Sequence, residues 1–228
     1  MENRLSRTSL AGSSDLWKPT LACLLIMLQG IGLNAAEGGK ATGLKDLAER
    51  HGLLIGGSSD LNRDDSKVEE IIAREFNILS NVNCLKPKRT QTERGIFDFQ
   101  QSDRFMEFCR EHGITPKGHL LVGRDTYQPE WMLDPSLTPE ELEDILILHI
   151  QTVMGRYKHG SPLGAIAYWD VLNEVFAYSS VFERIGTNED GDYLYWETAF
   201  RTAREVDPDC ILIWNEDNTE FDEPKGEK

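Results

Sequence analysis

An asparagine and a glutamate stand side by side where a buried strand is expected to end. Asn173 and Glu174 follow the largely apolar residues 169–172, and the small, apolar stretch 163–168 precedes them. Such a run is typical of a strand buried on both faces of a parallel sheet, and α/β barrels carry their chemistry at the carboxyl ends of strands. A glutamate there can protonate the oxygen of a departing sugar, and the asparagine can hold a sugar hydroxyl. Without further context, the pair is also typical of loop solvation or helix capping.

Apolar runs and helical periodicity alternate along the rest of the chain, which predicts an α/β fold. Strands are expected near residues 53–58, 76–80, 114–122, 164–173 and 210–215. Helices are expected near residues 67–75, 102–112, 138–158 and 191–206. The helix at 138–158 has a strong start, because Thr138 can cap it and Pro139 can occupy its first turn.

From about residue 44 onward the chain resembles glycoside hydrolase family ten, the retaining endo-β-1,4-xylanases. The family's acid/base strand typically reads Trp-Asp-Val-Val-Asn-Glu, and residues 169–174 match it with one conservative change. Segments 180–186, 199–209 and 213–218 resemble the following parts of the family in the same order. The resemblance implies a (β/α)8 TIM-barrel type of fold, with Glu174 as the acid/base and Asn173 as a sugar contact.

Two segments before this strand resemble the family's motifs but differ from them at several residues. Residues 76–86 resemble its second strand and retain Asn83 and Lys86, whereas Val82 and Pro87 stand where the family has Glu and Trp. The resemblance implies that Asn83 and Lys86 are substrate-binding residues. The alternative is that both only cap and solvate the loop.

The strand-three motif of the family, Gly-His-x-Leu-Val-Trp-His, appears as residues 118–124. His119 is kept and is expected at a strand end as a fourth substrate-binding residue, while Gly123 and Arg124 replace the Trp-His pair. The alternative for His119 is a hydrogen-bonded core histidine.

About five β/α units are present, so the barrel is expected to be incomplete, since eight are needed. In the family the nucleophilic Glu lies on strand seven, and no counterpart is identified here. Residues 219–222 read Thr-Glu-Phe-Asp, like the family's Thr-Glu-x-Asp nucleophile motif, but they follow the fifth strand without the crossover that a βαβ return needs. We interpret them as part of a polar tail, residues 219–228.

The resemblance and the incomplete barrel leave three hypotheses for the function. The first is retaining endo-1,4-β-xylanase activity on xylan, completed by a C-terminal fragment that supplies the nucleophile. The second is a non-catalytic protein that binds xylan or xylo-oligosaccharide. The third is a truncated gene product without a stable fold, because a five-stranded sheet exposes an open edge.

The N-terminus predicts export. Lys18 precedes an apolar run of 13 residues, 21–33, which is short for a membrane span, and small residues at 34–36 suit cleavage. We expect a signal peptide at 1–36, a partial barrel at 37–218 and a secreted or periplasmic location. An uncleaved anchor is the alternative.

The charge and the residue composition indicate which classes of partner the protein is not expected to bind, namely polyanions and metals. The chain has 39 acidic and 24 basic residues, a net charge of −15, which opposes binding to nucleic acid or to an anionic membrane. The five histidines show no metal-ligand spacing, and no metal or cofactor is expected. Cys84, Cys109 and Cys210 follow the export segment and are expected as buried thiols.

Overall fold

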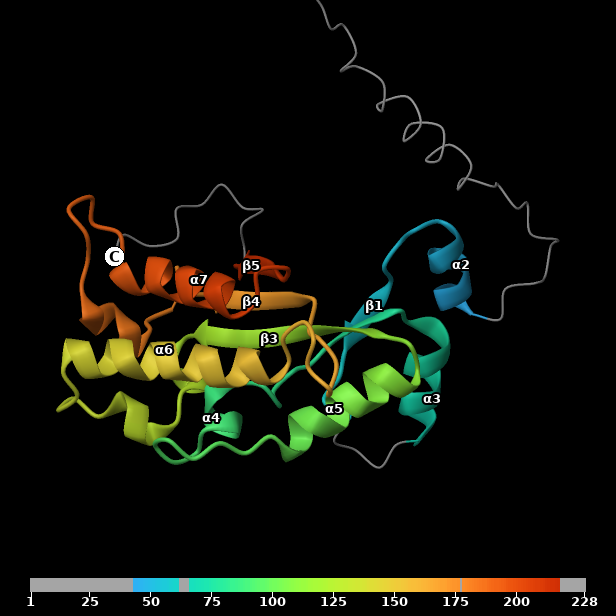
Figure 1. Cartoon of the computed structure of the whole chain (residues 1–228), viewed down its shortest axis with the longest axis horizontal. Helices are drawn as coiled ribbons and strands as arrows, with labels where there is room; N and C mark the ends of the chain where they lie inside the picture. The colour runs from blue at the N-terminus through green and yellow to red at the C-terminus, as the bar shows by residue number, and fades with distance from the viewer. Residues whose placement is uncertain (1–42, 62–65, 177, 218–228) are drawn as a thin grey trace, which may run out of the picture. The chain divides into compact units, whose positions relative to one another are not determined.

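A computed structural model describes residues 43–61, 66–176 and 178–217 of the chain. They form one sheet of five parallel strands in the order β1-β2-β3-β4-β5 (Figure 1). The strands are β1 (Gly56–Ser58), β2 (Ile78–Ser80), β3 (Thr115–Gly123), β4 (Tyr168–Asn173) and β5 (Ile211–Asn215). Five strands in sequence order, all parallel, confirm the predicted succession of β/α units.

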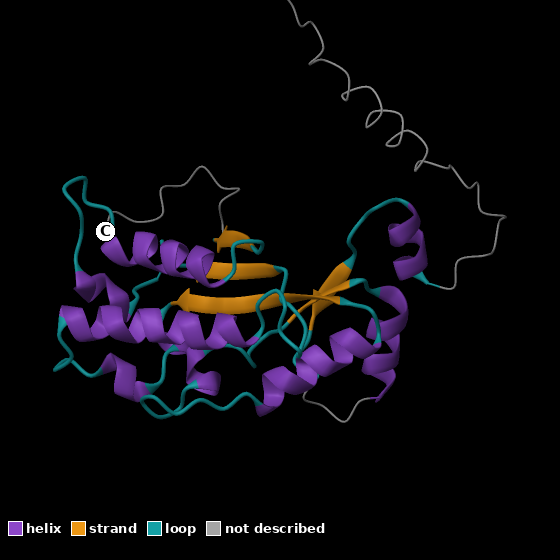
Figure 2. Ribbon diagram, in the orientation of Figure 1, coloured by secondary structure: helices purple, strands orange, loops and turns teal. Residues whose placement is uncertain are grey.

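Helices connect the strands (Figure 2). They are α2 (Leu44–Arg50), α3 (Ser66–Glu75), α4 (Pro87–Thr90), α5 (Gln100–Glu111), α6 (Pro139–Arg156) and α7 (Leu194–Val206). Short 3-10 turns lie at Asp125–Tyr127, Glu130–Leu133 and Val181–Ile185. Helices α5 and α6 contact β3, and α7 contacts α6, β4 and β5.

The start of α6 follows the predicted capping pattern. The Thr138 hydroxyl accepts a hydrogen bond from the Glu141 backbone at 3.2 Å, and the Glu141 carboxylate accepts one from the Thr138 backbone at 3.1 Å. This reciprocal capping box satisfies two N–H groups that the helix itself leaves unpaired. Pro139 occupies the first turn, where its missing N–H costs nothing.

The strands begin later than predicted, by one or two residues in β2, β3 and β5 and by more in β4 and β1. β4 begins at Tyr168 instead of residue 164, because Gly164 adopts φ 94° and closes a turn on Ser161. β1 begins at Gly56 instead of residue 53. Helices α2 and α4 were not expected from the sequence.

The core is built around a fully buried Trp169 on β4, which lies beside Gly118 of β3. A Cβ atom on Gly118 would lie 2.3 Å from Cε3 of Trp169, so only glycine permits this packing. Residues 169–173 are all buried, which confirms the expectation of a strand covered on both faces. Close packing on both faces fixes where β4 ends and therefore where Glu174 begins.

Cys84, Cys109 and Cys210 are buried free thiols, as expected, and burial raises the pKa of each. Among the described residues, no helix is long and apolar enough to cross a membrane. The expected signal peptide at 1–36 and the expected tail at 219–228 lie outside the described residues.

Candidate active site

The carboxyl ends of the five parallel strands meet at one edge of the sheet, and the candidate residues gather there. Asn173 closes β4 and pairs in register with Gly123 of β3 and Asn215 of β5. Glu174 is the next residue, so its side chain starts where strand pairing stops. The fold therefore places Glu174 where parallel α/β proteins bind their ligands.

Glu174 has an uncommon backbone conformation, with φ at 57° in the left-handed region that favours glycine. Its N–H donates to the Asn215 carbonyl at 2.8 Å. The Glu216 carboxylate accepts hydrogen bonds from the N–H groups of Val175 and Phe176 at 2.9 and 3.1 Å. These contacts hold a turn that costs about 1–3 kcal/mol of backbone strain, and such strain gathers at functional sites.

The carboxylate of Glu174 faces two side chains that come from the turn after β3. Tyr127 donates its hydroxyl proton toward Oε2 of Glu174 at 3.4 Å, and Nε of Arg124 lies 3.7 Å from the same oxygen. Arg124 also donates to the Tyr127 hydroxyl at 2.6 Å. Partial burial and the charge of Glu174 raise the pKa of Tyr127, so the phenol remains a proton donor.

Asn173 is fully buried beside the candidate acid. Its Oδ1 accepts a hydrogen bond from Nδ2 of Asn215 at 2.6 Å, which fixes the orientation of the amide. Its own Nδ2 is buried and has no hydrogen-bond partner among the described residues. A buried donor without a partner is costly, which makes it a candidate donor to a ligand oxygen.

His119 lies within β3 and not at the strand end where it was expected. Its Nδ1 is 2.9 Å from Oδ2 of Asp170, a buried carboxylate that also accepts a hydrogen bond from Lys117. The backbone N–H of His119 donates to Oδ1 of Asn81 at 2.7 Å. The ring is therefore hydrogen-bonded, as the alternative has it, and 21% of the side chain remains exposed to a ligand.

Asn83 is held by Asp60, which follows β1, and Lys86 is held in turn by Asn83. Oδ1 of Asp60 accepts three backbone hydrogen bonds at 2.7–3.0 Å, from residues 82–84, and Oδ2 accepts one from the Asn83 amide at 3.1 Å. Although burial opposes it, these bonds lower the pKa of Asp60. Lys86 donates to Oδ1 of Asn83 at 3.1 Å and lies 4.1 Å from the Tyr127 ring centre. Asn83, Lys86 and Glu174 are thereby linked through Tyr127.

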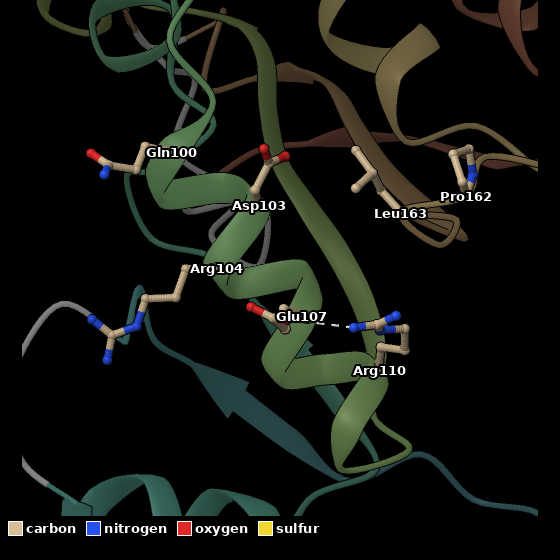
Figure 3. A pocket seen from close by; sticks show the side chains of 7 residues that line it. All are labelled: Gln100, Asp103, Arg104, Glu107, Arg110, Pro162 and Leu163. Atoms are coloured by element: carbon tan, nitrogen blue, oxygen red, sulfur yellow. Dashed lines mark ion pairs between the residues drawn. The ribbon is translucent and has the colours of Figure 1, made fainter.

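Two hollows in the described part of the chain differ in their position relative to this edge. One, of about 330 Å³, lies between α5 and the loop before β4, and Figure 3 shows its lining side chains. None of its lining residues follows the carboxyl end of a strand, so it is separate from the edge that carries Glu174. The other, of about 460 Å³, is lined by aromatic residues that include Trp196 and Trp214, whose rings are 5.0 Å apart. Trp196 thus packs α7 against β5, beside Phe176 of the loop that follows Glu174.

Four residues of the site were not predicted from the sequence: Asp60, Tyr127, Arg124 and Asp170. In the sequence, Arg124 is recognisable only as a departure from the family motif, and no pattern indicates a functional role for Tyr127. The register of β3 and β4 pairs His119 with Asp170, which a known strand alignment would have indicated. In the described part of the chain, no group of three or more His, Cys, Asp or Glu side chains could hold a metal ion.

Comparison with known proteins identifies clear relatives. Residues 43–228 match the family model of glycosyl hydrolase family 10. Endo-1,4-beta-xylanase B of Thermotoga neapolitana is 33% identical over 205 residues, which cover 88% of this chain and 57% of the relative. Endo-1,4-beta-xylanase A of Xylanibacter ruminicola is 30% identical over 212 residues, covering 87% of this chain and 53% of the relative.

Solved structures agree with these matches. Xylanase 10B from Thermotoga petrophila RKU-1, determined in complex with xylobiose, has a TM-score of 0.72 and 32% identity. The match covers 83% of this chain and 57% of that one. A mutant of xylanase 10C from Cellvibrio japonicus in complex with xylopentaose has a TM-score of 0.65 and 27% identity, over 79% of this chain and 38% of the other. This chain therefore spans a little over half the length of relatives such as the Thermotoga enzymes, and the fold of the matched part is a partial TIM barrel.

Proposed function

Since the chain belongs to glycosyl hydrolase family 10, we propose that it binds β-1,4-linked xylo-oligosaccharides at the carboxyl edge of its sheet. In this proposal Glu174 is the acid/base of a retaining endo-1,4-β-xylanase reaction. The observation that carries it is the position of Glu174, on a left-handed turn at the end of β4, with its carboxylate directed to Tyr127 and Arg124.

The chemistry assigned to Glu174 has two steps. First, its carboxylic acid protonates the glycosidic oxygen as the carbon–oxygen bond breaks; afterwards its carboxylate takes a proton from the water that releases the sugar. Asn173 donates from Nδ2 to a sugar hydroxyl, and Asn83, Lys86 and His119 contact neighbouring hydroxyls. In the first step a second carboxylate, about 5 Å away, must attack the sugar carbon as the leaving oxygen departs, and the resulting glycosyl-enzyme is what the water hydrolyses in the second step. We assign that carboxylate to a C-terminal polypeptide segment that complements this part of the barrel.

A second candidate function is binding of xylo-oligosaccharide without hydrolysis. Asp60 accepts three backbone hydrogen bonds, and Glu216 accepts two together with one from the Trp214 indole at 2.9 Å. Carboxylates committed to backbone N–H groups are poor nucleophiles, because attack on the sugar would require those hydrogen bonds to break. This observation favours a chain that holds the saccharide while its own carboxylates cannot complete the reaction.

Calorimetry with xylopentaose, together with an assay for reducing ends released from xylan, separates the two functions. Binding with release supports the hydrolase, and binding without release supports the second function. Absence of binding at millimolar xylopentaose would overturn both. Glu174→Gln should abolish release without removing binding, because an amide cannot donate the acid proton. Glu205→Gln, on the exposed face of α7, is the matched control and should change neither.

The location belongs to the same proposal. We infer that residues 1–36 form a secretory signal, that residues 37–218 form the partial barrel, and that the protein acts outside the cytoplasm on polysaccharide. The support is the apolar run at 21–33 followed by the small residues 34–36. The intact mass of the protein recovered from the culture medium or periplasm tests this: cleavage after residue 36 is expected, and retention of residues 1–36 would contradict it.

A further inference from the structure

An aromatic hollow lies beside β5 and the start of α7. The rings of Phe176 and Trp214 are stacked with their centres 5.0 Å apart, and Trp196 of α7 meets them edge-on, at 5.3 and 5.0 Å. Phe176 is 51% exposed and Trp214 is 36% exposed. With Tyr193 and Leu194 they line a hollow of about 460 Å³, a size typical of binding sites. Large apolar side chains that gather at one exposed place indicate an interaction surface.

The aromatic hollow adjoins an open edge of the sheet. β5 is an outer strand, with β4 as its one neighbour among the described residues (Figure 1). Ile211 donates its backbone N–H to the Ala167 carbonyl, on the β4 side, at 2.9 Å. Successive residues of a parallel strand direct their N–H groups to alternate sides, so those of Leu212 and Trp214 point away from β4. An outer strand with such groups is a template for a further strand.

The topology of the sheet determines which kind of element fits the hollow. A strand that adds beside β5 in parallel is reached through a crossover, usually a helix, and such crossovers are right-handed in nearly all proteins. Helix α7 connects β4 to β5 in this way. The same handedness places the next helix beside α7, on the face of the sheet where Trp196 and Trp214 meet.

The rim of the aromatic hollow is acidic. Asp192 and Glu197 contribute carboxylates to its lining, and residues 189–190 add two more in the same loop. Glu197 pairs with Arg201 at 3.1 Å, whereas Asp192 accepts only a long hydrogen bond, at 3.4 Å, from the Asn188 amide and belongs to no ion pair of the described residues. Lysine or arginine matches such a rim, and a second copy of a chain with a net charge of −15 does not.

The aromatic hollow also shares a turn with Glu174. Phe176 is two residues further along the chain. One oxygen of the Glu216 carboxylate accepts hydrogen bonds from the Phe176 N–H at 3.1 Å and from the Trp214 indole at 2.9 Å. A segment that occupies the hollow is therefore close to Glu174, as a segment that supplies the second carboxylate has to be.

We propose that the aromatic hollow is the docking site of an amphipathic helix whose apolar face is bordered by lysine or arginine, and that this helix belongs to the C-terminal segment that supplies the nucleophile. The inference rests on the proposed function, because it identifies where that segment binds. An apolar side chain of the helix packs against Phe176 and Trp214, and a basic side chain pairs with Asp192. The strand that follows the helix adds to the open edge of β5.

The test is calorimetry on the full chain with two synthetic helical peptides of about 18 residues, or five turns. Both peptides carry leucine on one face, and the borders of that face are lysine in one peptide and glutamate in the other. The lysine peptide should bind about 10-fold more tightly than the glutamate peptide at low salt, because its charge complements the rim. The difference should shrink at about 0.5 M salt, because ions screen exposed charges.

Variants locate the binding. Phe176→Ala should weaken the lysine peptide about 10-fold, because an aromatic side chain at the centre of an interface contributes much of its affinity. Asp192→Asn should reduce the preference for lysine over glutamate, which keeps the proposal testable where the first variant fails to fold. The matched controls are Leu148→Ala, at a 46% exposed leucine of α6, and Glu205→Gln, on the exposed face of α7. Neither control should change the affinity or the preference.

The outcomes separate this inference from the proposed function. Binding of the lysine peptide that is weakened in Phe176→Ala and kept in Leu148→Ala supports the inference. Absence of binding at millimolar peptide, or binding unchanged in both Phe176→Ala and Asp192→Asn, would overturn it. A dimer of the chain that dissociates in Phe176→Ala would assign the hollow to a second copy and overturn it as well.

Calorimetry with xylopentaose on the same protein tests the proposed function independently. Saccharide binding without peptide binding would overturn the docking site and leave the proposed function intact. Peptide binding without saccharide binding would overturn the proposed function, and with it the assignment of the helix to a segment that supplies the nucleophile.

Discussion

The buried histidine of α6 predicts a specific dependence of stability on pH. His149 is 2% exposed, stacks on Phe97 with ring centres 6.3 Å apart, and has no hydrogen-bond partner for either ring nitrogen among the described residues. Burial lowers its pKa from 6.5 to about 4, because a charged imidazolium would lose its hydration there. In the unfolded chain the imidazole keeps the higher pKa.

The sign and size of the effect follow from linkage. Between pH 6.5 and about 4 the unfolded state binds a proton that the folded state refuses, so stability is full above this window and falls as the pH falls through it. At about 1.4 kcal/mol per pH unit, the free energy of unfolding should drop by about 2 kcal/mol by pH 5 and about 3 kcal/mol by pH 4. Asp60, Asp103 and Asp207 have lowered pKa values in the folded protein. Their contributions to stability are therefore lost only as the pH falls below the usual pKa of a carboxyl group, which is below this window.

Urea unfolding at pH values between about 7 and about 4.5 measures the effect. His149→Leu should flatten the loss of stability between pH 6.5 and 5, because the titrating group is gone. His112→Gln, an exposed histidine at the end of α5, is the matched control and should keep the loss. The reasoning would be refuted if His149→Leu lost stability over this window as steeply as the unaltered protein.

Three further substitutions test the contacts that hold the site and its helices. Asp170→Ala should lower the free energy of unfolding by about 3 kcal/mol, the lower end for a broken buried ion pair, because Lys117 and His119 stay partly hydrated; a loss in urea unfolding below about 1 kcal/mol would contradict this. Glu216→Ala should cost about 2 kcal/mol in the same assay, since the turn after Glu174 loses its acceptor, and Glu216→Gln should restore most of it; equal losses in both variants would argue against that role. Thr138→Ala should lower the melting temperature through about 1 kcal/mol of lost capping, whereas an unchanged melt would show that the capping box adds nothing.

The sequence predicted those parts of the fold that depend on local pattern. β4 could be located because an apolar run leads to Asn173, and α6 because Thr138, Pro139 and Glu141 form a start signal that needs no tertiary contact. The true start of β4 was missed because a left-handed Gly164 looks the same in an apolar stretch whether it bends the chain or extends it.

The site was predictable only where one segment carries it. Glu174 and Asn173 are adjacent, so one motif identifies both. The contacts of Arg124 and Tyr127 with Glu174 join residues about fifty positions apart, through a turn whose path depends on how β3 and β4 pack. His119 was misplaced for a related reason, because its hydrogen bond to Asp170 depends on the register between two strands.

The central claim is that Glu174 is the acid/base of this site, and the measurement that tests it most directly compares two substrates in Glu174→Ala, in the presence of the C-terminal segment that supplies the nucleophile. Release of reducing ends from xylan should fall by about 100- to 10,000-fold, because its leaving group needs the proton. Cleavage of dinitrophenyl xylobioside, whose leaving group needs none, should continue when azide replaces water as the attacking group. Xylan cleavage by Glu174→Ala at the rate of the unaltered chain would contradict the account.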